Sequence, residues 1–408
     1  MNDAAFWIWL LRTLGPAAAL QDLLQYFGSA RGLYEAGSAE WRLSGLLTAK
    51  QITALTKFSP SQSADVLRDC AQNGWKIVTP DSILYPNRLR ELRNLPPVLF
   101  VWGDETVLLR EAQVAVVGTR KASAYGLRVT SLLTEALAKS GMVVVSGGAL
   151  GVDSAAHEGA LRAGGKTIAV LGCGLGTDYL RENGGLRRKI AHSGAVISEF
   201  LPYAPASRTT FPLRNRVISA LAPGTVVIEA GEHSGSLITA RCAMEQGRDL
   251  FAVPGDVISS AFTGANRLIR DGAKPVFSPM DVLEEYLYRF PDELHEACGE
   301  KTFGELLRES GQDTAQTPHA RSAERLKTEK DGKAPPDPGA PGSEPKALPD
   351  ALSENARTVY RVLAREPKHI DVLSEEAGLP AAACLAALTE LELYGCAELT
   401  EGRKYRKI

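Results

Sequence analysis

VAVVGTRKASAYG, residues 114–126, is an apolar β-branched run that leads through a glycine turn into a helical segment. The same succession recurs along the chain as far as residue 278. The later runs are MVVVSG (142–147), TIAVLG (167–172), AVISE (195–199), TVVIEA (225–230), DLFAVPG (249–255) and PVFS (275–278). Continuous apolar runs that alternate with helices are typical of parallel strands buried on both faces. The sequence therefore predicts an α/β core at residues 76–290, an extended Rossmann-like fold with a mainly parallel sheet of about seven strands.

The N-terminal part of the chain, residues 1–75, shows helical periodicity broken by short glycine turns. This pattern predicts a small helical domain of the SAM or helix-hairpin-helix type. The turn Leu14-Gly15-Pro16 permits two interpretations: it offers backbone N–H groups to a phosphate, or it only joins two packed helices. From residue 76 to residue 109, two apolar stretches, KIVT and PVLFVWG, flank a loop with proline and arginine. We interpret this segment as a connecting extension.

The chain changes character after the core. Residues 310–350 are rich in proline, glycine and charge, which predicts a disordered linker. Residues 351–408 regain helical periodicity in three segments and end in two strand-like stretches, which predicts a winged-helix domain. Its third helical segment, PAAACLAALTELELYG, has no lysine or arginine, so we expect it to pack or bind protein rather than read bases. The basic tail, with Arg403, Lys404, Arg406 and Lys407, remains a candidate for phosphate contacts.

Composition limits the function more than it identifies it. The 408 residues carry a formal net charge of -2, so any nucleic-acid site must be a local cluster of basic residues. The six cysteines lie far apart without a CxxC pair, and we expect neither a metal site nor disulfides. The apolar start carries Asp3 where a signal peptide has basic residues, and no later stretch approaches the ~20 apolar residues of a membrane span. We therefore expect a cytoplasmic protein with no membrane span.

Small and polar residues follow four of the expected strands, in VVGTRKASAYG, VSGGALGVDSAAH, VIEAGEHSGSLITA and VPGDVISSAFTG. In an open α/β sheet the ligand crevice lies at these carboxyl ends of the strands. Glycine turns let backbone N–H groups approach a phosphate, and the helix N-terminus that follows adds partial positive charge. The ligand is therefore expected to carry phosphate.

The standard nucleotide fingerprints do not fit this sequence. GALRAGGKT, residues 159–167, has one residue too many between its glycines for a P-loop and precedes a strand instead of following one. LGCGLG, residues 171–176, lacks the last spacing of GxGxxG. We expect no nucleotide cofactor.

Candidate catalytic residues are few. The sequence has no GxSxG, HExxH or Cys/His dyad. Asp153 and His157 fall four residues apart on an expected helix, where they either hydrogen-bond to each other or serve as helix cap and crevice support. Glu199 and Glu229 end two strands and are either crevice carboxylates or, for Glu229, a structural anchor of the next loop. We expect no catalytic residue and no enzyme activity.

Basic residues cluster around an aromatic one in SRTTFPLRNRVISALA, residues 207–222. The cluster contains Arg208, Phe211, Arg214 and Arg216. Arginine holds phosphates and phenylalanine offers a stacking face to a base, which is typical of single-stranded nucleic-acid binding. The alternative, a solvated charged turn, fits less well because it exposes Phe211.

These motifs, with ISEF and VVIEA followed by SGSLITA and LFAVPG, occur in an order that resembles the DprA/Smf family over residues 85–273. The resemblance implies a Rossmann-like core that binds single-stranded DNA, a homodimer through that core, and loading of RecA recombinase onto incoming DNA in natural transformation. It also implies phosphate contacts at Gly118, Thr119 and Arg120, with further contacts at Arg208 and Phe211. One departure is Leu180, where the family usually has proline, while Arg181 keeps the usual charge.

The expected DNA-binding residues are Gly118, Thr119, Arg120, Lys121, Gly147, Gly148, Arg181, Arg208, Phe211, Arg214, Asn215, Arg216, Ser234, Gly235 and Ser236. Two other functions compete with this prediction. The first is an enzyme similar to nucleoside-monophosphate phosphoribohydrolases, but their PGGxGT turn is absent from EAGEHSGSLITA. The second is a transcription regulator that acts through the winged-helix domain, which the uncharged third helix disfavours.

Overall fold

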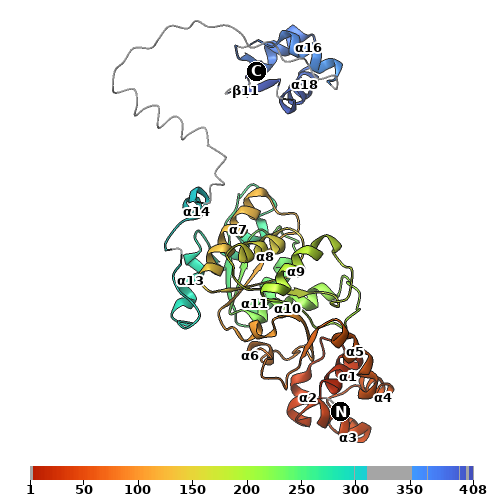
Figure 1. Cartoon of the computed structure of the whole chain (residues 1–408). Coiled ribbons are helices and arrows are strands. Elements are labelled where there is room, and N and C mark those ends of the chain that lie inside the picture. Colours follow the sequence, from red (N-terminus) through yellow and green to blue (C-terminus); the bar gives the residue numbers. More distant parts are fainter. Residues whose placement is uncertain are drawn as a thin grey trace. The chain divides into compact units, whose positions relative to one another are not determined.

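The computed structural model describes residues 3–297, 299–309, 352–364, 366–394, 396–400 and 404–407 (Figure 1). The chain divides into two compact units at residue 317. The expected linker at 310–350, Cys298 and Arg403 lie outside the described residues. The boundary that we expect between the N-terminal helices and the core falls inside the first unit and stays a prediction.

The first unit begins with five short helices, as their periodicity indicates. They are α1 (Ala4–Leu14), α2 (Leu20–Phe27), α3 (Ala30–Leu43), α4 (Ala49–Lys57) and α5 (Ala64–Gln72), with a 3-10 turn η1 (Pro60–Ser63) before α5. α1 is apolar on nearly all sides, and its residues from Ala5 to Leu11 are buried because the other helices surround it. Gly15 ends α1 with φ of 81°, a conformation that glycine adopts without strain.

A nine-stranded sheet forms the centre of the first unit, in the order β1-β2-β6-β5-β4-β3-β7-β8-β9. Seven strands are parallel: β3 (Gln113–Val117), β4 (Val143–Ser146), β5 (Thr167–Leu171), β6 (Ala195–Ser198), β7 (Gly224–Val227), β8 (Asp249–Ala252) and β9 (Lys274–Pro275). These are the strands that the apolar runs predict. The mainly parallel α/β fold is therefore confirmed.

Two further strands correct the expectation of a connecting extension before the core. β1 (Lys76–Val78) pairs antiparallel with β2 (Leu99–Gly103), and β2 pairs antiparallel with β6. The short helix α6 (Asn87–Arg90) lies between them, and the 3-10 turn η2 (Glu105–Leu109) follows β2. This segment is thus part of the sheet and its core.

Helices cover both faces of the sheet, as continuous apolar strands require. They are α7 (Ala124–Lys139), α8 (Val152–Arg162), α9 (Gly184–Ser193), preceded by η3 (Arg181–Asn183), α10 (Thr210–Leu221), α11 (Ser236–Glu245), α12 (Thr263–Arg270) and α13 (Met280–Leu287), with α14 (Phe303–Glu309) after them. α7 and α8 share one core cluster with α13. α10, α11 and α12 contribute to another, which includes the N-terminal helices.

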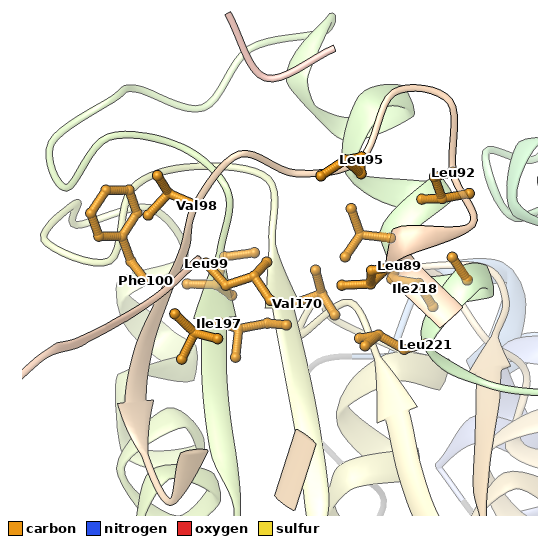
Figure 2. Close-up of a cluster of buried hydrophobic side chains, with 14 of the residues drawn as sticks. Leu89, Leu92, Leu95, Val98, Leu99, Phe100, Val170, Ile197, Ile218 and Leu221 are labelled. Carbon is orange, nitrogen blue, oxygen red and sulfur yellow. The ribbon is translucent and has the colours of Figure 1, made fainter. Parts of the chain in front are cut away.

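The segment before the core fixes the position of α10. Figure 2 shows buried side chains from α6, β2, β5, β6 and α10 in contact, among them Leu89, Leu99, Val170, Ile197 and Ile218. Each of these five is at most 1% exposed. Burial of one such side chain contributes about 1.5–3 kcal/mol. α10 is therefore held against the sheet by a dry apolar cluster.

The described residues of the second unit form three helices and a three-stranded sheet in the order β10-β12-β11. The helices are α16 (Glu354–Val362), α17 (Ile370–Ala377) and α18 (Ala381–Leu393), and the strands are β10 (Lys368–His369), β11 (Ala397–Thr400) and β12 (Lys404–Lys407). This is the expected winged-helix architecture. Among the described residues no single helix is both long and apolar enough to cross a membrane, and α17 and α18 pass that test only as a pair bent by 104°.

Candidate nucleic-acid interface

A pocket of about 500 Å³ lies where the carboxyl end of β3 meets the starts of α10 and α11. We call it the edge pocket. Most of the expected site residues line it, namely Gly118, Thr119, Arg120, Arg208, Phe211, Arg214, Asn215, Ser234, Gly235 and Ser236. The structure thus brings together three segments that lie up to about 120 positions apart in the sequence.

Phe211 is surrounded by cations and one aromatic ring. The guanidinium carbon of Arg120 lies 5.0 Å from the centre of its ring, and that of Arg214 lies 6.0 Å away. The ring of Tyr179 is 5.3 Å from it, centre to centre. Phe211 is half-buried, whereas Arg120 and Arg208 are exposed. Among the described residues, no carboxylate group forms an ion pair with either of these two arginines.

Arg214 and Asn215 hold the walls of the edge pocket instead of projecting into solvent. Arg214 is 5% exposed, and its Nη1 donates to the carbonyl oxygens of Gly147, at 2.6 Å, and Val170. Asn215 Nδ2 donates to the carbonyl oxygen of Gly235 at 3.3 Å. α10 therefore ties the turns that follow β4 and precede α11, and Gly147 contributes as a backbone acceptor rather than as lining.

The turn after β3 is fixed from two sides. Glu229, at the end of β7, accepts hydrogen bonds from the backbone N–H and the hydroxyl of Ser123, the latter at 2.7 Å. The Ser123 hydroxyl in turn accepts from Gly126 N at 3.0 Å and caps α7, an interaction worth about 1 kcal/mol. A Cβ on Gly118 would meet Val152 Cγ2 at 2.6 Å, so only glycine fits beside α8. Of the two roles expected for Glu229, crevice carboxylate or structural anchor of a loop, these contacts favour the structural anchor.

Arg216 lies outside the lining of the edge pocket. It forms a buried ion pair with Glu199, and its Nη2 also donates to the Pro16 carbonyl oxygen at 2.8 Å. Burial raises the pKa of Glu199 to about 7, although Arg216 opposes the rise. Three buried atoms of this pair, Glu199 Oε1 and Arg216 Nε and Nη1, have no hydrogen-bond partner. The turn at Leu14-Gly15-Pro16 therefore packs against the core through its carbonyl group.

Asp153 and His157 have separate partners. Asp153 lines the edge pocket and accepts from Ala149 N at 3.3 Å, and burial raises its pKa while the nearby Arg214 lowers it. His157 is fully buried, and its Nδ1 lies 2.7 Å from Thr167 Oγ1. Burial, with a smaller effect of Arg214, lowers the pKa of His157 to about 3, so its ring is neutral. The structure therefore contradicts the helix-cap role of Asp153, because Gly151 is the N-cap of α8 and no side chain caps it. Asp153 instead holds the turn before α8, and the buried contact of His157 with Thr167 agrees with a supporting role.

The remaining expected residues lie around the edge pocket or beyond it. Lys121 and Arg181 are exposed, and Gly148 is buried with φ of 66°. Arg181 lines a different cavity, at the start of α9. Sequence reasoning missed Tyr179, whose contact with Phe211 joins the loop after β5 to the start of α10, and the apolar lining at Ile218 and Ile238. Ile218 could have been predicted, because it lies four residues after Arg214 and therefore on the same face of the helix.

Comparison with known proteins identifies both units. A family model described as DNA recombination-mediator protein A matches residues 76–287, and one described as DprA winged helix domain matches residues 343–403. Protein Smf of Synechocystis sp. is 31% identical over 421 residues, which cover 100% of this chain and 99% of that protein. Protein Smf of Escherichia coli is 40% identical over 250 residues, 60% of this chain and 67% of that protein.

A solved structure resembles a large part of this chain. The X-ray structure of DNA processing protein A from Streptococcus pneumoniae matches with a TM-score of 0.60 and 33% sequence identity. The match covers 70% of this chain and 99% of that one. Among the described residues, no group of three or more His, Cys, Asp or Glu side chains is placed to hold a metal ion.

Proposed function

Because the chain belongs to the DprA/Smf family of DNA recombination-mediator proteins, we propose that its edge pocket binds single-stranded DNA without chemical turnover. The family resemblance drawn from the motifs is confirmed, and processing of DNA in recombination is the function that the family implies. The type of DNA, the contacts and the partners are the content of this proposal.

The arrangement of Arg120, Phe211 and Arg208 carries the proposal. The exposed guanidinium group of Arg120 lies over the half-buried ring of Phe211, and the exposed Arg208 lines the same pocket, which is formed in part by glycine and serine turns. Arginine and an aromatic face together suit a strand whose bases are unpaired, because duplex DNA hides the faces of its bases. The edge pocket therefore fits a single strand better than a duplex.

Each part of the edge pocket has a distinct task in this proposal. Arg120 and Arg208 neutralise phosphates, and the turns at 118–120 and 234–236 bring backbone N–H and hydroxyl groups close to them. Phe211 stacks on one base. Arg214 and Asn215 position these groups through the backbone carbonyls that they hold. Lys121, exposed beside Arg120, adds a further charge at the rim.

Partners follow from the same proposal. A protein that covers a single strand protects it and presents it to a recombinase, so we place the chain upstream of RecA in the recombination of incoming DNA. The proposed protein is a homodimer that acts through the Rossmann-like core, lies in the cytoplasm and needs no cofactor. The winged-helix unit is proposed to contact protein, since α18 has no basic residue and Glu390 accepts from Ser353 N at 2.8 Å at the start of α16.

Fluorescence anisotropy of labelled oligo(dT) with the full chain tests the proposal. Binding should weaken with salt, with a slope of about -0.7 in log affinity per phosphate contacted. Arg120→Gln and Arg208→Gln should each weaken binding and reduce that slope by one contact. The control is Arg128→Gln, because Arg128 is exposed on α7 outside the pocket lining. The proposal would be wrong if the affinity for oligo(dT) did not depend on salt concentration, or if neither arginine variant changed that affinity.

A further inference from the structure

A second cavity, of about 270 Å³, lies near the carboxyl end of β5 and the start of α9. Three arginines line it: Arg181, Arg187 and Arg188. We call it the arginine pocket. Of these three, only Arg181 is expected from the sequence motifs, and the edge pocket contains none of them.

The charge of the arginine pocket favours an anion. Asp178 is the one carboxylate in its lining, against three guanidinium groups, while Glu182 is exposed on the adjoining η3. Among the described residues none of the three arginines has an ion-pair partner within the 4.0 Å limit. Gly184, the first residue of the ten-residue helix α9, also lines the cavity, and the first turn has no acidic residue. The positive end of the helix dipole therefore adds to the arginines.

Arg187 is a buried cation without a counter-ion. It is 7% exposed, and burial lowers its pKa. Its Nη2 donates to the carbonyl oxygen of Tyr179, while its Nε has no hydrogen-bond partner. A buried guanidinium with an unsatisfied N–H is costly unless an anion compensates it. The helix thus keeps a charge in the cavity that a bound anion would stabilise.

Tyr179 connects the two pockets. Its ring contacts Phe211 of the edge pocket at 5.3 Å, and its carbonyl oxygen holds Arg187 of the arginine pocket. Gly172, which follows β5, is in contact with Phe211 as well, since a Cβ there would meet Phe211 Cδ1 at 2.7 Å. The two pockets are therefore linked through Tyr179, whose ring contacts one and whose carbonyl group contacts the other.

We propose that the arginine pocket is a second phosphate-binding site, which holds a phosphate of the same DNA strand that occupies the edge pocket. This inference rests on the proposed function, because the strand must first bind at Phe211. Short strands fill the edge pocket alone. Longer strands also neutralise Arg188 and Arg187 and gain affinity from them.

The test measures oligo(dT) binding by the full chain as a function of strand length. We compare strands of about 4 nucleotides with strands of about 12, a range typical of single-strand sites. Arg188→Gln should leave the short strands unchanged but weaken the long ones about tenfold at low salt, and reduce their salt slope by about 0.7. Arg188 is exposed, so this variant folds. Lys189→Gln is the matched control, since Lys189 is exposed on the same helix but lies outside the cavity lining.

Three outcomes separate the two proposals. Loss of long-strand affinity in Arg188→Gln but not in Lys189→Gln supports the second site. Equal behaviour of these two variants at both lengths overturns the second site and leaves the proposed function standing, because short strands still bind. Failure of every oligonucleotide to bind overturns both.

Discussion

Phe211 combines two roles that its residue type makes compatible. Its ring is a surface on which Arg120, Arg214 and Tyr179 rest, and it is also the face that the proposal offers to a base. A cation over an aromatic ring contributes about 0.5–1 kcal/mol at an exposed site. A base that stacks on Phe211 would therefore replace a weak contact between the ring and a neighbouring side chain such as Arg120.

Replacing Phe211 by Ala should weaken oligo(dT) binding by about 1–3 kcal/mol, the cost of one lost base stack. Tyr203→Ala is the control, because Tyr203 is 58% exposed and its ring contacts Trp75 instead of the edge pocket. Binding titrations of the two variants at one salt concentration provide the measurement. Equal affinities in Phe211→Ala and Tyr203→Ala would contradict the stacking role.

At the residue level, the sequence predicts which side chains gather but not which of them are free. Arg208, Arg214 and Arg216 look alike in the sequence, yet Arg208 is exposed while the other two are 5% and 6% exposed. Their burial depends on acceptors on β5 and directly after β4 and β6, such as Glu199, which no local pattern associates with α10. The local sequence therefore could not show which arginines are exposed and available to DNA and which are buried and structural.

The loop that joins β5 to η3 contains the one non-glycine residue with positive φ among the described residues, Leu180, with φ of 51° and ψ of 60°. An L-residue in this left-handed conformation costs roughly 1–2 kcal/mol. Proline cannot adopt it, because its ring fixes φ near −65°. A proline at position 180, which the motif resemblance leads us to expect, would therefore require a different loop conformation from the one seen here.

Two substitutions at Leu180 should have different effects on stability. Leu180→Pro, although it restores the residue usual in the family, should lower the free energy of unfolding by about 1–3 kcal/mol. Leu180→Gly should change it by less than about 1 kcal/mol, since relief of strain offsets the added freedom of the unfolded chain. Denaturant unfolding of both variants gives the comparison. A proline variant as stable as the glycine variant would show that the loop conformation is not fixed.

At the level of elements, the parallel strands were predictable and the antiparallel ones were not. Seven apolar runs correspond to β3 through β9. The strands β3 to β7 are buried along their whole length, which is why their runs are continuously apolar. β1 has only three residues, and β2 pairs with β6 nearly 100 positions later, so nothing local indicates that either belongs to the sheet. The arginine pocket escaped prediction for the same reason, since Trp102 of β2 forms part of its lining.

The N-terminal helices and the core are tied together in the first unit at Arg216, which contacts both Glu199 and the Pro16 carbonyl. A buried ion pair of this kind contributes little net stability, because desolvation opposes the attraction of the charges. Its effect is to fix where the helices sit relative to α10. The pair thus makes the stability of the first unit depend on pH.

Glu199→Gln should change that pH dependence in a defined direction. Burial raises the pKa of Glu199 from 4.5 to about 7, so the folded chain binds this proton more tightly than the unfolded chain. The contribution of Glu199 to the free energy of unfolding should therefore fall as pH rises from 4.5 to about 7, by up to about 3 kcal/mol, and the variant should lack this loss.

His157 acts in the opposite direction, since its lowered pKa removes stability as pH falls below 6.5. It is present in both proteins and cancels in their difference. Denaturant unfolding of wild type and Glu199→Gln at several pH values gives that difference, which should shift in favour of the variant as pH rises. A difference that does not vary with pH would mean that Glu199 keeps an ordinary pKa.

The two outermost strands of the large sheet are its shortest parallel and antiparallel members: β9 has two residues, one of them Pro275, and β1 has three. A strand from another molecule that approached either side would find few N–H and C=O groups to pair with, and proline offers no N–H at all. The sheet is thereby protected from intermolecular strand addition and from aggregation by that route. The proposed association of two copies through the core is therefore expected to use surfaces other than these strand edges, where substitutions can alter it without disturbing the sheet.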